Sequence, residues 1–315
     1  MKFHLNFKPS TCGFNISHQH QLFLIGSCFS DNIGDRLQAH KFQSVQNPCG
    51  VLFNPISIQQ TLMHGIQKPK PNANILLEQN NQVFSFLHHS KIKAGSKNEL
   101  LQNIQVLNDQ NHQALQASDF IFITFGSAYH YYHTELMVTV ANCHKQNQNL
   151  FEKRLMQALE IVNIYNALLA ELKQINPKLK CIFTVSPVKH LKDGVVENNR
   201  SKSILIMAVH QLVEENENAY YFPAYELVND DLRDYRFYKA DLAHPNELAV
   251  DYVWQKFSDC FFEENTKKIN IEIQKLNAYL NHNNLHAAQH NGSEHEPYIE
   301  NQKKCIQQLY PEIQF

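Results

Sequence analysis

Two short motifs far apart in the chain carry side chains that could act together as nucleophile, base and orienting acid. Ser27 and Cys28 directly follow an apolar run that ends in Gly26. A strand that ends in glycine and turns at once into a helix places the next side chains beside unpaired helix N–H groups, which favour an anion, and α/β enzymes hold nucleophiles at such corners. Asp241 stands three residues before His244, so its carboxylate can receive one imidazole N–H and leave the other ring nitrogen facing a nucleophile. The alternative for this second motif is that Asp241 caps a turn and His244 lies on the surface.

Buried strands that alternate with long helices should place both motifs at one edge of a sheet. Apolar runs predict strands at 21–25, 119–125, 180–185 and 219–222. Apolar residues at helical spacing predict helices at 31–40, 57–66, 97–117, 149–173, 198–214 and 248–262, and residues 129–144 predict a short hairpin or loop. This alternation predicts an α/β fold with a mostly parallel sheet covered on both faces. Ligands bind outside the carboxyl ends of the strands in such sheets, so functional residues should follow the strands.

Composition excludes several classes of protein. The 315 residues are 43% hydrophobic and 18% charged, which is typical of a globular chain and not of a disordered or coiled-coil one. A formal net charge of -2 argues against a nucleic-acid or anionic-membrane surface. The N-terminal residues lack the apolar core of a signal peptide, and no apolar run reaches the length of a spanning helix. The cysteines include no CxxC pair and favour reduced thiols, so we expect a cytoplasmic protein without nucleic-acid or membrane partners; its oligomeric state stays open.

Several long motifs in one order resemble those of a known family. Residues 26–30 read GSCFS, and the likeness continues through NPCGVLFNP, TFGSAYHY, ANCHK, SPVKHLKDGVVENNRSKS and YFPAYELVNDDLRDYRFYKADLAHP. On these residues the chain resembles the GSCFA family, which looks like a branch of the SGNH or GDSL hydrolases. The resemblance implies a flavodoxin-like three-layer α/β/α fold and activity mainly on acyl esters. It covers residues 1–265, which we expect to form the SGNH-like domain, and leaves 266–315 as a helical C-terminal extension packed on the core.

The resemblance also assigns roles to residues around the glycine corner. The SGNH motif Gly-Asp-Ser aligns without gaps on Gly26, Ser27 and Cys28, which places Cys28 at the nucleophile position; a shift of one residue restores Ser27. A cysteine fits because a helix N-terminus and a nearby histidine lower the pKa of a thiol, and the thiolate is the attacking form. The alternative for Cys28 is a small buried apolar residue. Gly50 resembles the glycine whose backbone N–H completes the oxyanion hole, a role that needs close backbone approach.

A third SGNH motif, Gly-x-Asn, falls on Gly126, Ser127 and Ala128, so its asparagine is absent. Losing one oxyanion donor typically costs about a hundred- to a thousandfold in rate. Either the chemistry differs or another side chain substitutes, and the candidates are Asn54, Ser127, Tyr129 and Asn142.

Two further clusters at predicted strand ends could hold a substrate. Cations and amides suit an anionic or polyhydroxylated molecule, and they occur here as His190, Asn199 and Lys202, and again as Asn142 and His144. The alternative for each cluster is a structural loop network. The His18/His20 and His88/His89 pairs suggest a metal only faintly, because no carboxylate or cysteine accompanies them at ligand spacing, so we expect neither a metal nor a cofactor.

The leading hypothesis is therefore an SGNH-like acyl-ester hydrolase or acyltransferase that acts on a small polar or carbohydrate-type substrate. Cys28 or Ser27 would attack, His244 would act as general base and then acid, Asp241 would orient His244, and Gly50 would help to hold the oxyanion. The missing asparagine at Ala128 favours an alternative, a catalytically inactive module that keeps the pocket for binding. A metal-dependent hydrolase is a third possibility.

Overall fold

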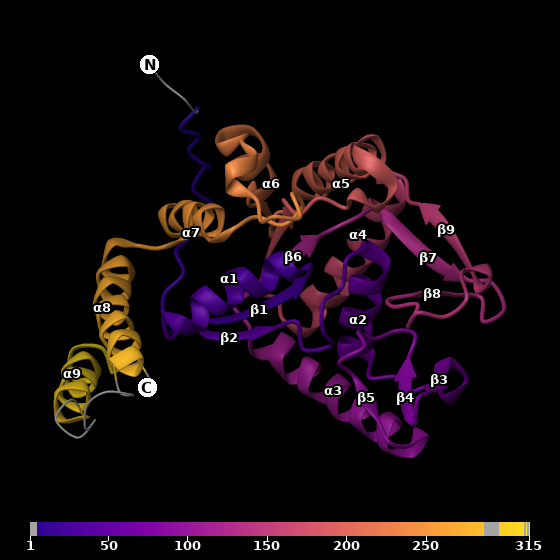
Figure 1. Ribbon diagram of the computed structural model, residues 1–315, viewed down its shortest axis with the longest axis horizontal. Helices are drawn as coiled ribbons and strands as arrows, with labels where there is room; N and C mark the ends of the chain where they lie inside the picture. The colour runs from indigo at the N-terminus through magenta and orange to yellow at the C-terminus, as the bar shows by residue number, and fades with distance from the viewer. Residues whose placement is uncertain (1–4, 287–295, 312, 314) are drawn as a thin grey trace.

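The computed structural model describes residues 5–286, 296–311, 313 and 315, which fold around a central parallel sheet (Figure 1). Within this part of the chain the sheet has five strands, in the spatial order β2 (Gln43–Gln46), β1 (Gln21–Gly26), β6 (Phe120–Phe125), β10 (Lys180–Val185) and β11 (Ala219–Tyr221). Every neighbouring pair is parallel. Counted along the chain the order is 2-1-3-4-5, the flavodoxin-like arrangement, so the predicted fold class is confirmed.

Helices cover both faces of the sheet because successive strand side chains point to opposite faces. On one face Phe23, Ile121 and Phe183 belong to a core with apolar residues of four helices. These helices are α2 (Pro55–Gln67), α3 (Lys97–Ala117), α4 (Ala158–Ile175) and α5 (Gly194–Glu215). On the other face Leu24 and Phe122 pack with residues of α1 (Cys28–Ala39) and α7 (Glu247–Phe261). The result is the three-layer arrangement seen in Figure 1.

Strand β2 was not predicted from the sequence. Its four residues alternate between exposed and half-buried, and Val45 is the one apolar side chain among them. An edge strand without a buried face lacks the apolar pattern by which strands are recognised, so its sequence gives no signal.

Two small antiparallel sheets lie beside the central one, at the right of Figure 1. The first consists of β3 (Leu76–Gln79), β4 (Gln82–Ser85) and β5 (Lys93–Ala94). The second consists of β8 (Val138–Val140), β7 (Tyr129–His133) and β9 (Phe151–Leu155). Strands β7 and β8 confirm the hairpin expected within 129–144.

The predicted helix over 149–173 is wrong in its first part. Residues Gln148–Leu150 form a short 3-10 turn, η2, and the next five form β9, which pairs with β7. In β9 exposed Glu152 and Arg154 alternate with half-buried neighbours, and the Arg154 guanidinium lies 3.8 Å from the centre of the Tyr132 ring across the strand pair. This period of two outweighs the helical pattern, and the helix starts only after Gln157, where a capping box with Glu160 begins α4.

Short helical turns connect the remaining elements. They are η1 (Ala73–Ile75), η3 (Leu191–Asp193), α6 (Ala224–Glu226), the π-helical turn η4 (Leu227–Leu232) and η5 (Tyr235–Phe237).

The C-terminal segment forms α8 (Glu264–His286) and α9 (Glu296–Leu309), which lie beside each other at the left of Figure 1. They share a small apolar cluster of their own, with Ile269, Ile273 and Ile306. The Asn277 side chain donates a 2.7 Å hydrogen bond to the Ala39 carbonyl at the end of α1. Across the described ranges, no helix combines the length and apolarity that a membrane crossing needs.

Candidate active site

The corner between β1 and α1 is fixed by the backbone. Gly26 has φ +137°, and a β-carbon there would overlap the Thr124 carbonyl oxygen of the neighbouring strand, so only glycine fits. The Ser27 N–H donates to that same oxygen at 3.2 Å, and helix α1 starts at the next residue. Cys28 therefore occupies the first helical position, at the carboxyl edge of the sheet.

Ser27 and Cys28, the two candidate nucleophiles, have different surroundings. Ser27 has 0% of its surface exposed, and its hydroxyl accepts a hydrogen bond from the Phe29 N–H as the N-cap of α1. Cys28 is a half-buried free thiol. Burial raises the pKa of the Cys28 thiol and Asp31 raises it further, which outweighs the opposite effects of the Cys28 backbone N–H and of Lys202 and Lys239. The lowered thiol pKa expected from the sequence is therefore not what these surroundings produce.

The Asp241–His244 pair is formed. His244 Nδ1 lies 2.6 Å from Asp241 Oδ2, while Asp241 Oδ1 accepts from the N–H groups of Ala243 and His244. These backbone bonds, together with the imidazole, lower the pKa of Asp241 to about 2. Asp241 thus caps its turn with one oxygen and orients the imidazole with the other, and Nε2 is the ring nitrogen left to reach a nucleophile.

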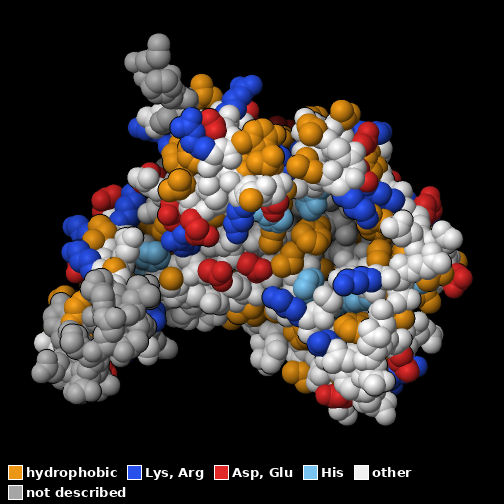
Figure 2. Space-filling view, in the orientation of Figure 1, with side chains coloured by type: hydrophobic (Ala, Val, Ile, Leu, Met, Phe, Trp, Pro, Cys, Tyr) orange, Lys and Arg blue, Asp and Glu red, His pale blue; other side chains and the backbone are white. Residues whose placement is uncertain are grey.

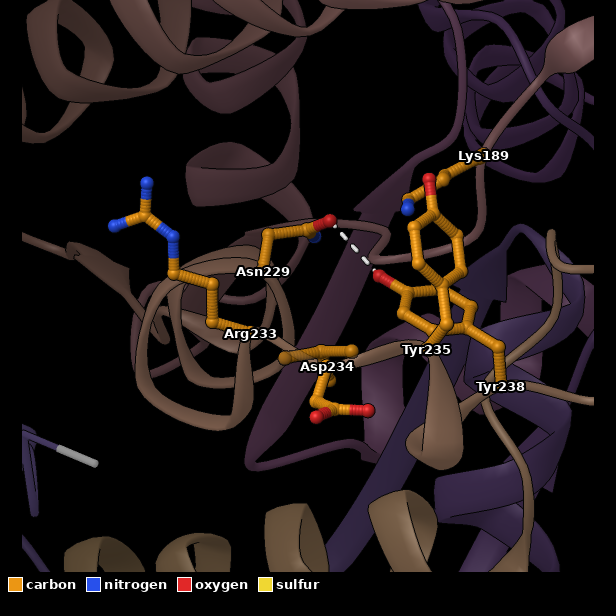
Figure 3. A pocket seen from close by; sticks show the side chains of 7 residues that line it. Lys189, Asn229, Arg233, Asp234, Tyr235 and Tyr238 are labelled. Carbon is orange, nitrogen blue, oxygen red and sulfur yellow. Dashed lines mark hydrogen bonds between the residues drawn. The ribbon is translucent and has the colours of Figure 1, made fainter. Parts of the chain in front are cut away.

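A clamp of aromatic rings holds this loop against the end of β10. Figure 3 shows Lys189 beside Tyr235 and Tyr238, and the Lys189 ammonium lies 4.2 Å from each ring centre. The Tyr238 hydroxyl donates to Asn229 at 2.9 Å, beside a small cavity of about 150 Å³. The Lys189 N–H also donates to the Ala243 carbonyl at 3.0 Å. Lys189 therefore joins the loop after β10 to the loop that carries His244.

Lys202 lies beneath the site. Its side chain is buried, and its ammonium donates to the carbonyls of Gly126 at 2.6 Å and Ser186 at 2.7 Å. Burial lowers the pKa of Lys202 to about 7. Lys202 thus ties together the ends of β6 and β10, and its expected role in substrate binding stays a prediction.

Ala128 stands where the Gly-x-Asn motif has its asparagine, and this position is not open to the surface. Ala128 has 0% of its surface exposed and donates its N–H to the Ser201 hydroxyl. The Ser127 hydroxyl accepts from the Tyr129 N–H at 3.1 Å and lies 3.3 Å from the Ser201 hydroxyl. The N–H groups of Gly126 and Ser127 both donate to the Phe53 carbonyl, at 2.8 and 3.0 Å.

Gly50 sits in a tight turn. It has φ +79°, and a β-carbon there would overlap the side chain of His89. Its N–H, the expected oxyanion donor, donates at 2.7 Å to the Asn47 carbonyl. The amide is thus engaged within the turn, and its role as an oxyanion donor stays a prediction.

Asn47 is a residue that the sequence analysis missed. Its Oδ1 accepts from the Gly26 N–H at 2.8 Å, and its Nδ2 donates to Asp31 at 2.7 Å. It therefore links the end of β1, the first turn of α1 and the Gly50 turn. The sequence shows Asn-Pro here, which indicates a turn but not these long-range bonds.

Four of the predicted substrate-binding residues form loop networks of their own. Asn54 is buried and caps α2 through the Ser57 N–H at 2.8 Å. Asn142 accepts from the His144 N–H, and His144 Nε2 lies 2.9 Å from the Ser85 carbonyl oxygen. Asn199 is exposed and accepts from Asn198 at 3.2 Å. These bonds lie within the loops that carry the residues, and a role of the four in holding a substrate or an oxyanion stays a prediction.

The surface over the strand ends is hollowed. Figure 2 shows histidine side chains around a hollow in the middle of this face, with Lys and Arg side chains near it. His190 and His244 are close enough for the charge of one to lower the pKa of the other. Among the residues that the structure describes, no group of three or more His, Cys, Asp or Glu is arranged to hold a metal ion.

Solved esterase structures resemble this chain at low identity. The carbohydrate esterase family 3 structure from Talaromyces cellulolyticus is 9% identical, with a TM-score of 0.37 over 76% of this chain and 95% of that one. A catalytic mutant of Axe2, an acetylxylan esterase from Geobacillus stearothermophilus, is 11% identical, with a TM-score of 0.38 over 80% and 95%. Est2A, an acetyl xylan esterase from Butyrivibrio proteoclasticus, is also 11% identical, with a TM-score of 0.38 over 80% and 64%. A search of curated proteins found no match.

Sequence motifs give the more specific comparison. The GSCFA family matches residues 21–257, a span that contains the central sheet, the glycine corner and the Asp241–His244 pair. The chain belongs to the GSCFA family.

Proposed function

We propose that this protein is an SGNH-type acyl-ester hydrolase or acyltransferase that uses Cys28, His244 and Asp241 on a small polar or carbohydrate-type substrate. The observation that carries the proposal is the Asp241–His244 pair, held at 2.6 Å with the carboxylate kept ionised. A carboxylate that fixes an imidazole through Nδ1 is the orienting half of a nucleophile–histidine–acid triad.

Burial and hydrogen bonding favour Cys28 over Ser27 as the nucleophile. The Ser27 hydroxyl has no exposed surface and serves as the cap of α1, so using it would uncap the helix. The Cys28 thiol is half-buried at the first helical position. Because its pKa is raised, the thiol is protonated at neutral pH, and the reaction needs a general base.

The reaction follows from these roles. His244 Nε2 takes the Cys28 proton as the sulfur bonds to the substrate carbonyl carbon, and the carbonyl π electrons move onto oxygen. Collapse of this intermediate breaks the bond to the alcohol, which receives the proton from His244, and leaves a thioester on Cys28. Water, or an acceptor alcohol in a transferase, then attacks the thioester with His244 again as base and releases the free thiol.

The test combines turnover with covalent labelling. We expect the protein to hydrolyse p-nitrophenyl acetate at neutral pH and the Cys28→Ala and His244→Ala variants to lose this activity. An acyl donor should leave an adduct on Cys28 that mass spectrometry detects. Cys305→Ala is the matched control, because Cys305 is an exposed thiol on α9, and it should retain full turnover. Unchanged turnover in Cys28→Ala and His244→Ala would reject the assignment.

A binding module is the second candidate. Two expected oxyanion donors are not available, which favours this candidate. Buried Ala128 replaces the asparagine, and the Gly50 N–H already donates to the Asn47 carbonyl. This candidate predicts that an acyl donor leaves no adduct on Cys28 and that the wild-type protein does not hydrolyse p-nitrophenyl acetate.

A further inference from the structure

His190 is a polar side chain at the site without a hydrogen-bond partner for one of its nitrogens. Its Nε2 is buried and makes no hydrogen bond to any described residue. A buried polar atom left unpaired costs free energy, so such an atom in a functional cleft calls for an explanation.

The position of this nitrogen is defined by the end of β6. A β-carbon at Gly126 would lie 3.3 Å from His190 Nε2 and 3.1 Å from the Phe53 carbonyl oxygen. Because residue 126 is glycine and has no side chain, the imidazole can lie close to the end of β6. The Gly-x-Asn motif would place its asparagine donor at this same strand end.

Hydrogen bonds connect this place with the Cys28 corner. The Leu52 N–H donates to the Gly26 carbonyl at 2.9 Å, and the following residue, Phe53, accepts from the Gly126 N–H. Lys202, which donates to the Gly126 carbonyl, is near enough to lower the pKa of Cys28. His190, Gly126 and Cys28 therefore surround the same strand ends.

The ring is held in place by contacts that leave Nε2 unpaired. The backbone N–H of His190 donates to Asn198 Oδ1 at 2.9 Å, and Phe53 meets the imidazole edge to face, with 5.4 Å between ring centres. On the preceding residue, the Lys189 clamp fixes the backbone. A donor that is already oriented needs no reorganisation when charge develops on a substrate.

The electrostatic surroundings keep this imidazole neutral. Burial and, after it, the positive charges of Lys202 and His244 together lower the pKa of His190 to about 4, against a smaller opposite effect of Asp193. At neutral pH His190 therefore has one N–H, and in the Nε2–H tautomer that N–H is the unpaired group. A neutral imidazole can donate a hydrogen bond to an oxyanion without competing with His244 for the proton of the nucleophile.

We propose that His190 Nε2–H donates the oxyanion hydrogen bond that the missing asparagine would supply, and this inference rests on the proposed acyl-transfer function. Of the substitutes considered from the sequence, the Ser127 and Tyr129 hydroxyls are engaged with Ser201 and Glu197. The amide oxygens of Asn142 and Asn54 accept from the N–H groups of His144 and Ser57 in their own loops. His190 is the catalytic residue that the third motif lacks.

The experiment compares an ester with its thionoester. In a thionoester the carbonyl oxygen is replaced by sulfur, which accepts hydrogen bonds poorly. A donor to the oxyanion therefore accelerates the hydrolysis of p-nitrophenyl acetate much more than that of the corresponding thionoacetate. In His190→Phe, which keeps a ring against Phe53 but removes the donor, kcat for the ester should fall by about 10² to 10³, and kcat for the thionoester by less than about tenfold. His190→Gln, which retains an N–H donor, should recover part of the ester rate.

The controls separate this inference from the proposed function. His210→Ala removes an exposed histidine of α5, the helix that follows the His190 loop, and should change neither rate. If folded His190→Phe protein loses kcat equally for the ester and the thionoester, or loses none, His190 is not the oxyanion donor. The proposed function still stands in that case, provided that Cys28→Ala and His244→Ala are inactive. If the wild-type protein turns over neither substrate, or if Cys28→Ala is fully active, the proposed function fails and the inference with it.

Discussion

The loop that carries His244 and the loop that carries His190 use the same side chain in opposite surroundings. His244 has 47% of its side chain exposed and bonds through Nδ1 to an ionised carboxylate. His190 is half-buried, stands near the Lys202 ammonium, which outweighs the effect of Asp193, and leaves its buried Nε2 unpaired. A carboxylate partner suits an imidazole that accepts a proton, and burial beside cations suits one that stays neutral and donates. Neighbouring groups, and not residue type, therefore separate the two roles.

Among the tests of this contrast, the Asp241→Asn substitution has the largest expected effect. Asparagine can keep the turn through its oxygen, but its amide cannot hold His244 in the tautomer that presents a basic Nε2. We expect ester turnover to fall by about 10⁴-fold, with little change in the melting temperature. Asp234→Asn is the matched control, because Asp234 pairs with Arg236 at 2.9 Å in the same segment, and it should retain turnover. Retained turnover in Asp241→Asn would remove the distinction between the two histidines.

The next largest effect separates the two glycines that end strands at the site. Gly26→Ala meets the backbone of Thr124 and requires a φ that alanine avoids, so the free energy of unfolding should fall by at least ~3 kcal/mol. Gly126→Ala meets Phe53 and His190 at 3.1 to 3.3 Å, and it should cost only about 1 kcal/mol. Because the added methyl displaces His190, Gly126→Ala should still lower ester turnover by about tenfold or more.

Thermal unfolding and ester kinetics of both glycine variants give the measurement. A Gly126→Ala protein with normal turnover would show that the space beside β6 is not used in the reaction. A Gly26→Ala protein as stable as the wild type would show that the corner is not under the backbone constraint described above.

The pH dependence of stability tests Lys202, the cation beside His190. Its pKa of about 7 lies below the unfolded value of about 10.4, so the unfolded chain binds more protons between these values. The contribution of Lys202 to the free energy of unfolding is therefore lowest at and below about pH 7 and rises towards pH 10, by at most about 1.4 kcal/mol per pH unit. The neutral amine still has two N–H groups for the two carbonyls that it joins.

Urea unfolding of the wild type and Lys202→Met at about pH 6.5 and about pH 9 measures this contribution. The difference in unfolding free energy between the two proteins should move in favour of the wild type at the higher pH. A difference that does not change with pH would mean that the pKa of Lys202 is the same in the folded and unfolded chain, so that burial does not disfavour its charge.

The smallest effect concerns the clamp that joins the two histidine loops. Lys189→Met removes the ammonium between Tyr235 and Tyr238, which should lower stability by about 0.5 to 1 kcal/mol and ester turnover only a few-fold. Lys192→Met, on the same loop, is the control. A loss of turnover as large as that of Asp241→Asn would show that the clamp does more than position the loops.

The sequence could predict the elements that bury a continuous apolar face. Phe120–Phe125 and Lys180–Val185 were found because almost every side chain in them is buried. The edge strand Gln43–Gln46 and the strand Phe151–Leu155 were not, because their pairing partners and not their own apolar residues define them. The local pattern of apolar residues indicates which side chains are buried, but it says little about which strands pair.

The candidate site divides in the same way. Asp241 and His244 are three residues apart and could be paired from the sequence alone. The unpaired nitrogen of His190 depends on Gly126, Phe53 and Lys202, which come from three other parts of the chain. The bond that engages the Gly50 amide likewise depends on the conformation of its turn. Such properties exist only once the chain is folded.

The segment from Asn47 to Phe53 sets a limit on how this protein can be altered. It bonds to Gly26 through both the Asn47 side chain and the Leu52 N–H, and it bonds to β6 through the Phe53 carbonyl. An inserted residue would shift all of these bonds out of register, so this loop should not tolerate the length variation that loops usually allow. The β7–β8–β9 sheet is bonded largely to itself, and insertions at its hairpin tips should leave the strand ends intact. Variation in length within the family is therefore expected in that sheet and not in the Asn47–Phe53 segment.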